Sequence, residues 1–260
     1  MRAEARRLYG MDPEGYEAGR PEYPERIYEV LVERCGVKSG TAVVEIGAGT
    51  GRVTRRLVAL GARVVAVEPD PVLAAELAEA TADGTVQVVG TSFEQARLAE
   101  GAFDVAVAAT SFHWVDQDLG MPKLGRVLRP GGWAALWWTV FGDPDRADPF
   151  RDATKDLLAE TGGPPGGPDR PQFELDVAER TSDLGSRAGL VGAGAELIRW
   201  TARLDPPQVR RLYGSMIAIL RRPGAERRRL LDGLVAIATD EFGGVVERPF
   251  VTAIYTARRP

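Results

Sequence analysis

The residues whose types and spacing could do chemistry first gather in the stretch 43–52. A short apolar run is followed by glycines at positions 47, 49 and 51, and then by an amphipathic stretch. This pattern predicts a buried strand, a glycine turn and a helix. Glycines let a ligand approach the backbone closely, and the start of a helix offers free backbone N–H groups. The stretch therefore predicts a ligand site.

The spacing of the glycines bears on which ligand binds. A dinucleotide fold requires G-x-G-x-x-G, but Arg52 stands where the third glycine would be. Glu45 suits a ligand with an ammonium group better than a pyrophosphate. The stretch resembles motif I of the class I S-adenosylmethionine (SAM) methyltransferases. That resemblance assigns five residues to the cofactor site: Glu45, Gly47, Ala48, Gly49 and Gly51. A glycine turn without a ligand, or with another nucleotide, stays open as an alternative.

An acid ends the next predicted strand, 63–68. Glu68 follows Gly47 by 21 residues (68 − 47), and Pro69 comes next. An acid at this spacing can accept hydrogen bonds from both ribose hydroxyls of a nucleoside. Asp70 is expected to be the N-cap of a helix over 71–82.

Two further strand ends belong to the predicted cofactor site. The strand 85–90 precedes Ser92 and Phe93, and the resemblance implies a short polar residue near the adenine and an apolar one over its ring. Thr91 or Ser92 would supply the polar group, and Phe93 is expected to stack on the base. Thr110, directly after the strand 103–109, is assigned to the cofactor as well.

The segment after the fourth strand carries the candidate catalytic residue. His113 is the only histidine, and its place suits a general base or a substrate-orienting group. His113-Trp114 resembles the His-Trp pair of trans-aconitate-methyltransferase-like proteins, in which Trp114 would pack against SAM or the pocket wall. Nothing here resembles the Asp/Asn-Pro-Pro-Tyr element of enzymes that methylate nucleobases, which argues against a nucleic-acid substrate.

The N-terminal segment 1–24 is expected to form an arm or lid. Residues 16–24 resemble the Y-x-x-G-R-P-x-Y-P segment of small-molecule SAM methyltransferases. By that resemblance Tyr16 and Arg20 close over the methionine end of SAM, since an arginine fork suits a carboxylate. Tyr16 is the second choice as a base.

The elements that must position these residues alternate between strand and helix. Such alternation predicts an α/β fold with a doubly wound, mostly parallel sheet. The resemblance implies seven strands in a Rossmann-like sheet with an antiparallel last strand, plus a helical cap. We expect one structural domain with these parts: an arm (1–24), a SAM-binding core (25–139), a cap insertion with a flexible glycine-proline loop (140–178), and the rest of the core with a helical roof over 206–241 (179–260).

The cap and roof are expected to complete a substrate pocket. Its expected residues are His113, Trp114, Phe141, Tyr213 and Met216. Phe150 and Phe173 are further possible walls, although core packing explains them equally well.

Composition narrows the class of protein. The chain has 260 residues, a net charge of −4, and no apolar run near membrane-spanning length, so neither a nucleic acid nor a membrane is expected as partner. One cysteine excludes an intrachain disulfide and a cysteine-cluster metal site, and no metal is predicted. The absence of a signal-peptide pattern suggests a cytoplasmic protein.

These observations predict a methyltransferase that moves the SAM methyl group by SN2 displacement to an O, N or C atom of a small molecule, leaving S-adenosylhomocysteine (SAH). A non-catalytic SAM-binding module and a nicotinamide oxidoreductase are the alternatives. The identity of the acceptor and the oligomeric state stay open.

Overall fold

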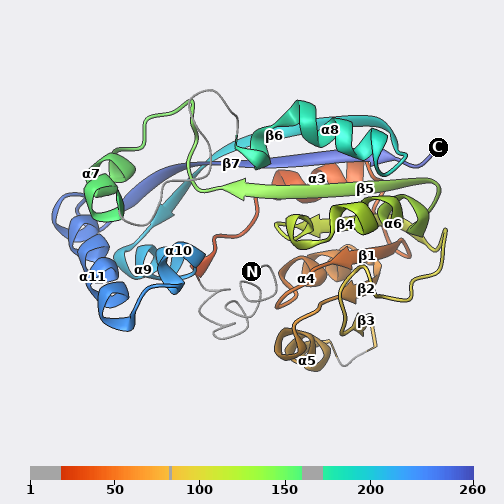
Figure 1. Ribbon diagram of the computed structural model, residues 1–260, viewed down its shortest axis with the longest axis horizontal. Helices are drawn as coiled ribbons and strands as arrows, with labels where there is room; N and C mark the ends of the chain where they lie inside the picture. The colour runs from red at the N-terminus through yellow and green to blue at the C-terminus, as the bar shows by residue number, and fades with distance from the viewer. Residues whose placement is uncertain (1–18, 82–83, 160–171) are drawn as a thin grey trace. The chain divides into compact units, whose positions relative to one another are not determined.

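The computed structural model describes residues 19–81, 84–159 and 172–260 (Figure 1). The chain divides into two compact units. One, here called the sheet unit, comprises Pro24–Thr139, Phe173–Ile198 and Thr252–Pro260. The other, here called the helical unit, comprises Val140–Gln172 and Arg199–Val251 together with the N-terminal residues up to Tyr23. No helix among the described residues is both long and apolar enough to cross a membrane.

The described residues form a sheet of seven strands in the order β3-β2-β1-β4-β5-β7-β6. Strands β1 to β4 are rich in valine and alanine, as is usual for strands that helices cover on both faces. The strand bounds are β1 Ala42–Ile46, β2 Arg63–Val67, β3 Val86–Val89, β4 Phe103–Ala109, β5 Leu128–Val140, β6 Val191–Leu204 and β7 Val246–Arg258.

Pairing directions confirm the predicted sheet. The pairs β1–β2, β1–β4, β2–β3 and β4–β5 are parallel. Gly131 pairs with Arg259 at one end of β5, and Thr139 contacts Thr252 at the other. Residue numbers therefore rise along β5 as they fall along β7, which is antiparallel pairing. The arrows of β5 and β7 in Figure 1 point in opposite directions.

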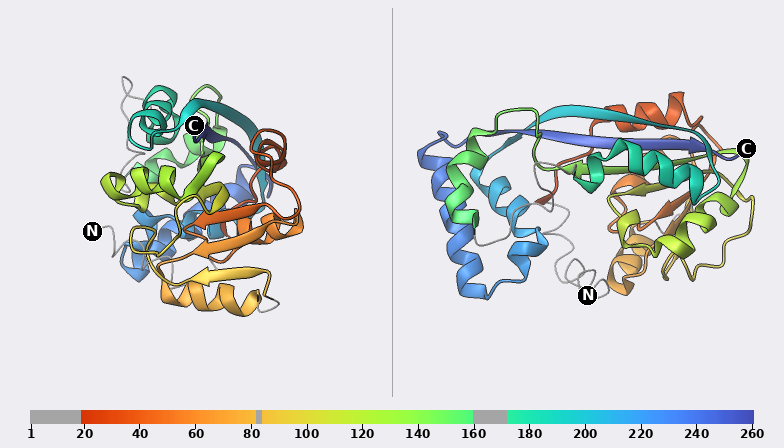
Figure 2. Two further views of the ribbon diagram at one scale, coloured as in Figure 1. Left: turned by 90° about the vertical axis from the view of Figure 1, so that its right-hand side faces the viewer. Right: turned by 45° about the horizontal axis from the view of Figure 1, so that its top comes forward.

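Helices cover both faces of this sheet. Figure 2 shows α6 and α8 on one face and α3 on the other. Leu124 of α6 and Leu184 of α8 are buried in the same core cluster as Val44 of β1. Asp70 caps α5 by accepting hydrogen bonds from two backbone N–H groups, as predicted. The helices of this unit are α3 Glu25–Glu33, α4 Arg52–Ala59, α5 Pro71–Ala80, α6 Gln117–Val127 and α8 Val177–Ser186, with short 3-10 turns at Phe112–Trp114 (η1) and Phe173–Leu175 (η3).

The helical unit has its own core. Phe150, Leu212, Leu234 and Phe250 are fully buried in it. Its helices are α7 Pro149–Leu158, α9 Pro206–Gly214, α10 Ile217–Leu220 and α11 Gly224–Asp240.

Some element bounds differ from the sequence expectation. The cap insertion contains the α-helix α7, whose start Asp148 caps and whose bounds the sequence pattern did not predict. The sequence predicts that the helical roof begins with one helix over 206–220. The structure has two helices there, α9 and α10, because the chain leaves the helical conformation at Met216. The sequence predicts a strand from Trp133 to Thr139. Strand β5 begins earlier, at Leu128, since Gly131 and Gly132 already pair with Arg259. The expected flexible loop around 162–168 lies outside the described residues.

Candidate active site

The glycine turn joins β1 to α4 with little room on one side. Gly47 has φ +73°, and a Cβ there would lie 2.6 Å from the Cβ of Ser111. Ser111 donates its hydroxyl hydrogen bond to the Ile46 carbonyl, so the end of β1 is tied to the segment after β4. A side chain at position 47 is thus excluded both by conformation and by packing.

The other side of the turn is open. Gly49 also has a positive φ, +58°, but nothing lies within 4 Å of the place where its Cβ would stand. Gly51 is the N-cap of α4, and a Cβ there would run into Leu77. The open space at Gly49 is therefore where a ligand can approach the backbone.

Glu68 holds this turn against the end of β2. It is 6% exposed, and its Oε2 accepts a hydrogen bond from the Gly49 N–H at 2.7 Å while Oε1 accepts one from the Asp70 N–H at 2.8 Å. Each carboxylate oxygen can accept a second hydrogen bond. The same side chain can therefore hold the turn and accept from a ribose.

Glu45 lies beneath the turn rather than on its open side. It is 1% exposed, and Thr54 of α4 donates a hydrogen bond to its Oε2 at 2.5 Å. The pKa of Glu45 is raised to about 8, mainly by burial; the hydrogen bond from Thr54 opposes this shift, and the nearby charge of Glu68 adds to it. A carboxyl that is neutral at pH 7 is a brace for α4 and not a fixed counter-charge for an ammonium group.

The expected adenine residues do not all lie at a surface. Ser92 is half-buried, and its carbonyl accepts from the N–H groups of Gln95 and Ala96. Phe93 is 2% exposed, packs against the ring of Phe112 and lies under the ammonium of Lys123. Phe93 is a core residue, because its buried ring offers no face on which a base could stack.

Three other expected cofactor residues line the strand ends. Ala48 is buried, and its N–H donates to the Val67 carbonyl. Pro69 is half-buried directly after Glu68. Thr110 is the one non-glycine residue in the described part of the chain with a positive φ, 54°. Such backbone strain is common at functional sites, where the surrounding structure maintains it.

His113 lies in η1, directly after β4, and its ring is held by Trp138 of β5. The Trp138 indole N–H donates to the His113 Nδ1 at 3.0 Å, and Trp114 packs on the imidazole at 4.8 Å between centroids. An indole N–H can only donate, so Nδ1 must be the unprotonated nitrogen. The neutral ring then carries its proton on Nε2 and presents a donor there.

The remaining expected residues that the structure describes belong to the helical unit. Tyr16 lies outside the described residues. Arg20 donates to the Ser215 carbonyl at 3.3 Å and lies 4.6 Å from the ring centroid of Phe141. Tyr213 is buried and accepts from Arg248, and Met216 packs at the edge of the helical core. Phe150, fully buried, is core packing rather than a pocket wall.

Sequence reasoning missed Trp138 and Thr54. Trp138 lies at the end of a predicted strand, next to Trp137, so strand alternation could have placed the two indoles on opposite faces. Thr54 lies three residues into a predicted helix, where its hydroxyl gave no sequence signal of a buried carboxyl partner.

Comparisons with known proteins agree with this geometry. Residues 44–136 match a family model described as a methyltransferase domain. An uncharacterized methyltransferase of Mycobacterium tuberculosis is 30% identical over 227 residues, covering 86% of this chain and 82% of the relative. An uncharacterized methyltransferase of Schizosaccharomyces pombe is 24% identical over 224 residues, covering 86% and 84%.

Solved methyltransferases share the fold. A structure from Anabaena variabilis has a TM-score of 0.65 at 17% identity and covers 90% of this chain and 98% of its own. Phosphoethanolamine N-methyltransferase 2 of Haemonchus contortus, solved with phosphomonomethylethanolamine and SAH, has a TM-score of 0.58 at 14% identity and covers 96% and 57%.

The chain therefore belongs to the SAM-dependent methyltransferase family and has its class I fold. The enzyme class and the cofactor are those predicted from the glycine turn. Family membership decides against the nicotinamide oxidoreductase and the non-catalytic module.

Proposed function

We propose that this methyltransferase acts on a small molecule and transfers the methyl group to one of its O, N or C atoms. The proposal is supported by the acidic net charge and by the segment after β4, which lacks the element typical of nucleobase methylation. The single observation that carries it is the placement of His113 and its aromatic neighbours directly after β4, at the edge where the glycine turn also lies.

The cofactor fits the residues of the turn. Gly49 leaves open space for close approach, and Glu68 offers carboxylate lone pairs to the ribose hydroxyls. When bound, SAM supplies a methyl group that its sulfonium already activates. The protein then mainly aligns the acceptor and excludes water, which can lower a barrier by roughly 7 to 11 kcal/mol at the upper end.

His113 acts in this proposal as a hydrogen-bond donor that orients the acceptor. Because the Trp138 N–H occupies Nδ1, the Nε2–H faces outward from that contact and can bind an acceptor oxygen. A general-base role would require the opposite tautomer, in which two N–H groups would point at each other. Of the two sequence-based roles for His113, the orienting role is therefore the one we propose.

The cofactor half of the proposal is tested by thermal unfolding of the full chain with SAH and, separately, with NADH. Stabilisation by SAH alone is expected. Glu68→Ala should weaken SAH binding about 10- to 100-fold, the value of one hydrogen bond to a charged group. Glu76→Ala, on the exposed side of α5, is the control and should leave the affinity unchanged.

The acceptor half is tested by a small-molecule screen with methyl-labelled SAM, with a short RNA and a DNA duplex as competing acceptors. Label transfer to nucleic acid would overturn the small-molecule assignment. Equal SAH affinity of Glu68→Ala and the unaltered chain would remove Glu68 from the cofactor site.

A further inference from the structure

A small cavity lies beside His113 in the sheet unit, just large enough for one water molecule. Trp138, Phe173 and Tyr255 give it an aromatic wall. Arg180 of α8 also lines it, and no sequence motif singled this residue out. Arg180 therefore places a positive charge among aromatic side chains and next to His113, where a charge is costly unless it is paired.

Arg180 is buried to an unusual degree for an arginine. It is 7% exposed, and its guanidinium lies 3.8 Å from the ring centroid of Phe173. Its Nε is fully buried and has no hydrogen-bond acceptor among the described residues. A buried charged donor without an acceptor is costly, so an acceptor oxygen at this place would be bound strongly.

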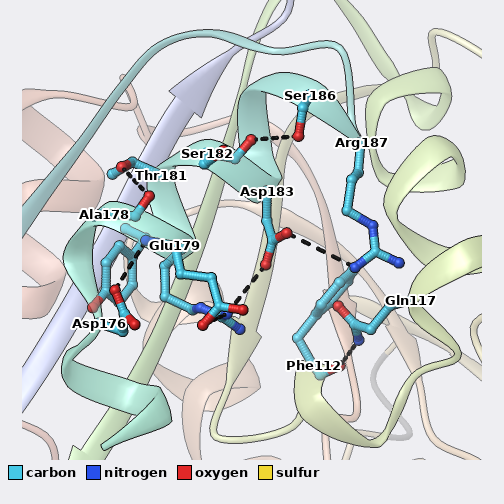
Figure 3. Close-up of polar contacts among 12 residues, drawn as sticks. Phe112, Gln117, Asp176, Ala178, Glu179, Thr181, Ser182, Asp183, Ser186 and Arg187 are labelled. Carbon is cyan, nitrogen blue, oxygen red and sulfur yellow. Dashed lines mark hydrogen bonds and ion pairs between the residues drawn. The ribbon is translucent and has the colours of Figure 1, made fainter. Parts of the chain in front are cut away.

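The other end of the guanidinium is already held. Nη2 lies 2.8 Å from a carboxylate oxygen of Glu179 and 3.3 Å from one of Asp183. Figure 3 shows that Asp183 also pairs with Arg187, the C-cap residue of α8. Glu179 is half-exposed, so water screens its charge. These pairs orient Arg180 without consuming its Nε–H.

Two other polar side chains, Gln117 and Tyr255, line the cavity, and both use their own donors on backbone carbonyls. Gln117 donates from its amide nitrogen to the Phe112 carbonyl, as Figure 3 shows. The same nitrogen also donates to the Val115 carbonyl. The Tyr255 hydroxyl donates to the Glu174 carbonyl. Arg180 Nε–H is therefore the buried side-chain donor of this cavity that has no acceptor among the described residues.

We propose that this cavity is an oxyanion subsite that receives one oxygen of a carboxylate carried by the methyl acceptor. The cavity has room for a single oxygen atom, and Arg180 supplies a charge-assisted hydrogen bond to it. His113 binds the acceptor on the side of its reacting atom. The proposal rests on the proposed function, because it names the acceptor's class at the same site.

The sole histidine makes the subsite directly observable. Sodium formate is titrated into the full chain saturated with SAH, and the ¹⁵N and ¹H signals of the His113 ring are followed by NMR. We expect a saturable shift, with a Kd no tighter than about 1 mM for a ligand of three heavy atoms. Sodium chloride controls for ionic strength, and formamide is the neutral isostere. The same spectra report the tautomer of His113, expected to be protonated on Nε2.

Three variants assign the shift to Arg180. Arg180→Gln and Arg180→Lys should each raise the Kd for formate at least tenfold, because both remove the Nε–H donor. Arg187→Gln removes the arginine at the C-cap of α8, which shares Asp183 but does not line the cavity, and this variant should bind formate as the unaltered chain does.

The outcomes separate this proposal from the proposed function. Absence of a saturable formate shift, equal affinity for formamide, or unchanged affinity in Arg180→Gln would overturn the oxyanion subsite while SAH binding stands. Loss of SAH stabilisation in the unaltered chain would instead overturn the cofactor site. If both Arg180 variants lose SAH stabilisation through misfolding, the comparison of formate with formamide in the unaltered chain decides.

Discussion

Two buried glutamates at neighbouring strand ends have different tasks in this fold. Glu68 accepts two backbone hydrogen bonds, which suit its charged form and hold the glycine turn. Glu45 accepts one from Thr54 and is enclosed on all sides, so that burial favours its neutral form. The first residue is placed to meet a ligand and the second to support the turn from below.

A difference in pH dependence follows for Glu45. Its pKa rises from 4.5 when unfolded to about 8 when folded, so between these values the folded chain binds more protons than the unfolded chain. The free energy of unfolding should therefore fall as pH rises through this window, by up to about 1.4 kcal/mol per pH unit from this group, and level off above it. Glu45→Gln should remove this contribution.

The measurement is urea unfolding of both proteins across the window from about pH 5 to pH 8 and above it. The variant should gain stability relative to the unaltered chain as the pH increases. Parallel stability curves for the two proteins would show that Glu45 ionises in the folded state as it does in water.

Among single residues, the sequence predicted those that directly follow a strand. Glu68 and His113 follow strands whose ends meet at one sheet edge, so order alone brought them together. Trp138 could not be found in this way, because its hydrogen bond to His113 joins residues 25 positions apart in the chain. Phe93 was misassigned because an apolar residue after a strand packs inward as readily as it faces a ligand.

Among the elements, the glycine turn between β1 and α4 needs one glycine for packing, Gly47, and another for ligand access, Gly49. Gly47 faces Ser111 across a gap too small for a methyl group, and Gly49 faces open space. Both have a positive φ, which costs a residue with a side chain about 1 to 2 kcal/mol. A side chain at position 47 would in addition clash with Ser111, whereas nothing lies within 4 Å of a Cβ at position 49.

Gly47→Ala and Gly49→Ala should therefore separate stability from binding. We expect Gly47→Ala to lower the free energy of unfolding by more than the backbone cost of about 1 to 2 kcal/mol, since Ser111 must also move. Gly49→Ala should cost no more than that amount but should weaken SAH binding more than tenfold. Chemical unfolding and calorimetry with SAH measure the two quantities. Equal stability losses would show that Ser111 adjusts freely.

The elements themselves were largely predictable, since β1 to β4 are short apolar runs separated by helix signals. The start of β5 was not, because Pro130 and two glycines normally end a strand. Here Gly131 and Gly132 bond to Arg259, a partner 127 or more positions away that no local pattern announces. The same holds for α7, whose cap by Asp148 lies within a stretch that local signals describe as a loop.

For the molecule as a whole, each of the two compact units must keep its own interior stable. The core of the helical unit encloses an ion pair between Arg248 and Asp148, whose side chains are 3% and 4% exposed. Arg248 also donates to the Tyr213 hydroxyl at 2.8 Å and to the Phe141 carbonyl at 3.0 Å. Every arm of this guanidinium thus has an acceptor, and the network joins β7, α9 and the start of α7.

Removing one partner from this network should be costly. Asp148→Asn leaves a buried arginine without its counter-charge and should lower the free energy of unfolding by about 3 to 5 kcal/mol. Asp232→Asn breaks the exposed pair with Arg210 in the same unit and should cost about 0 to 1 kcal/mol. Urea unfolding measures the loss in the free energy of unfolding. Faster amide hydrogen exchange in α9 and α11 would show that the loss lies in the helical unit. Similar losses for the two variants would mean that Arg248 finds water or another acceptor, and that its burial contributes little to holding the helical core together.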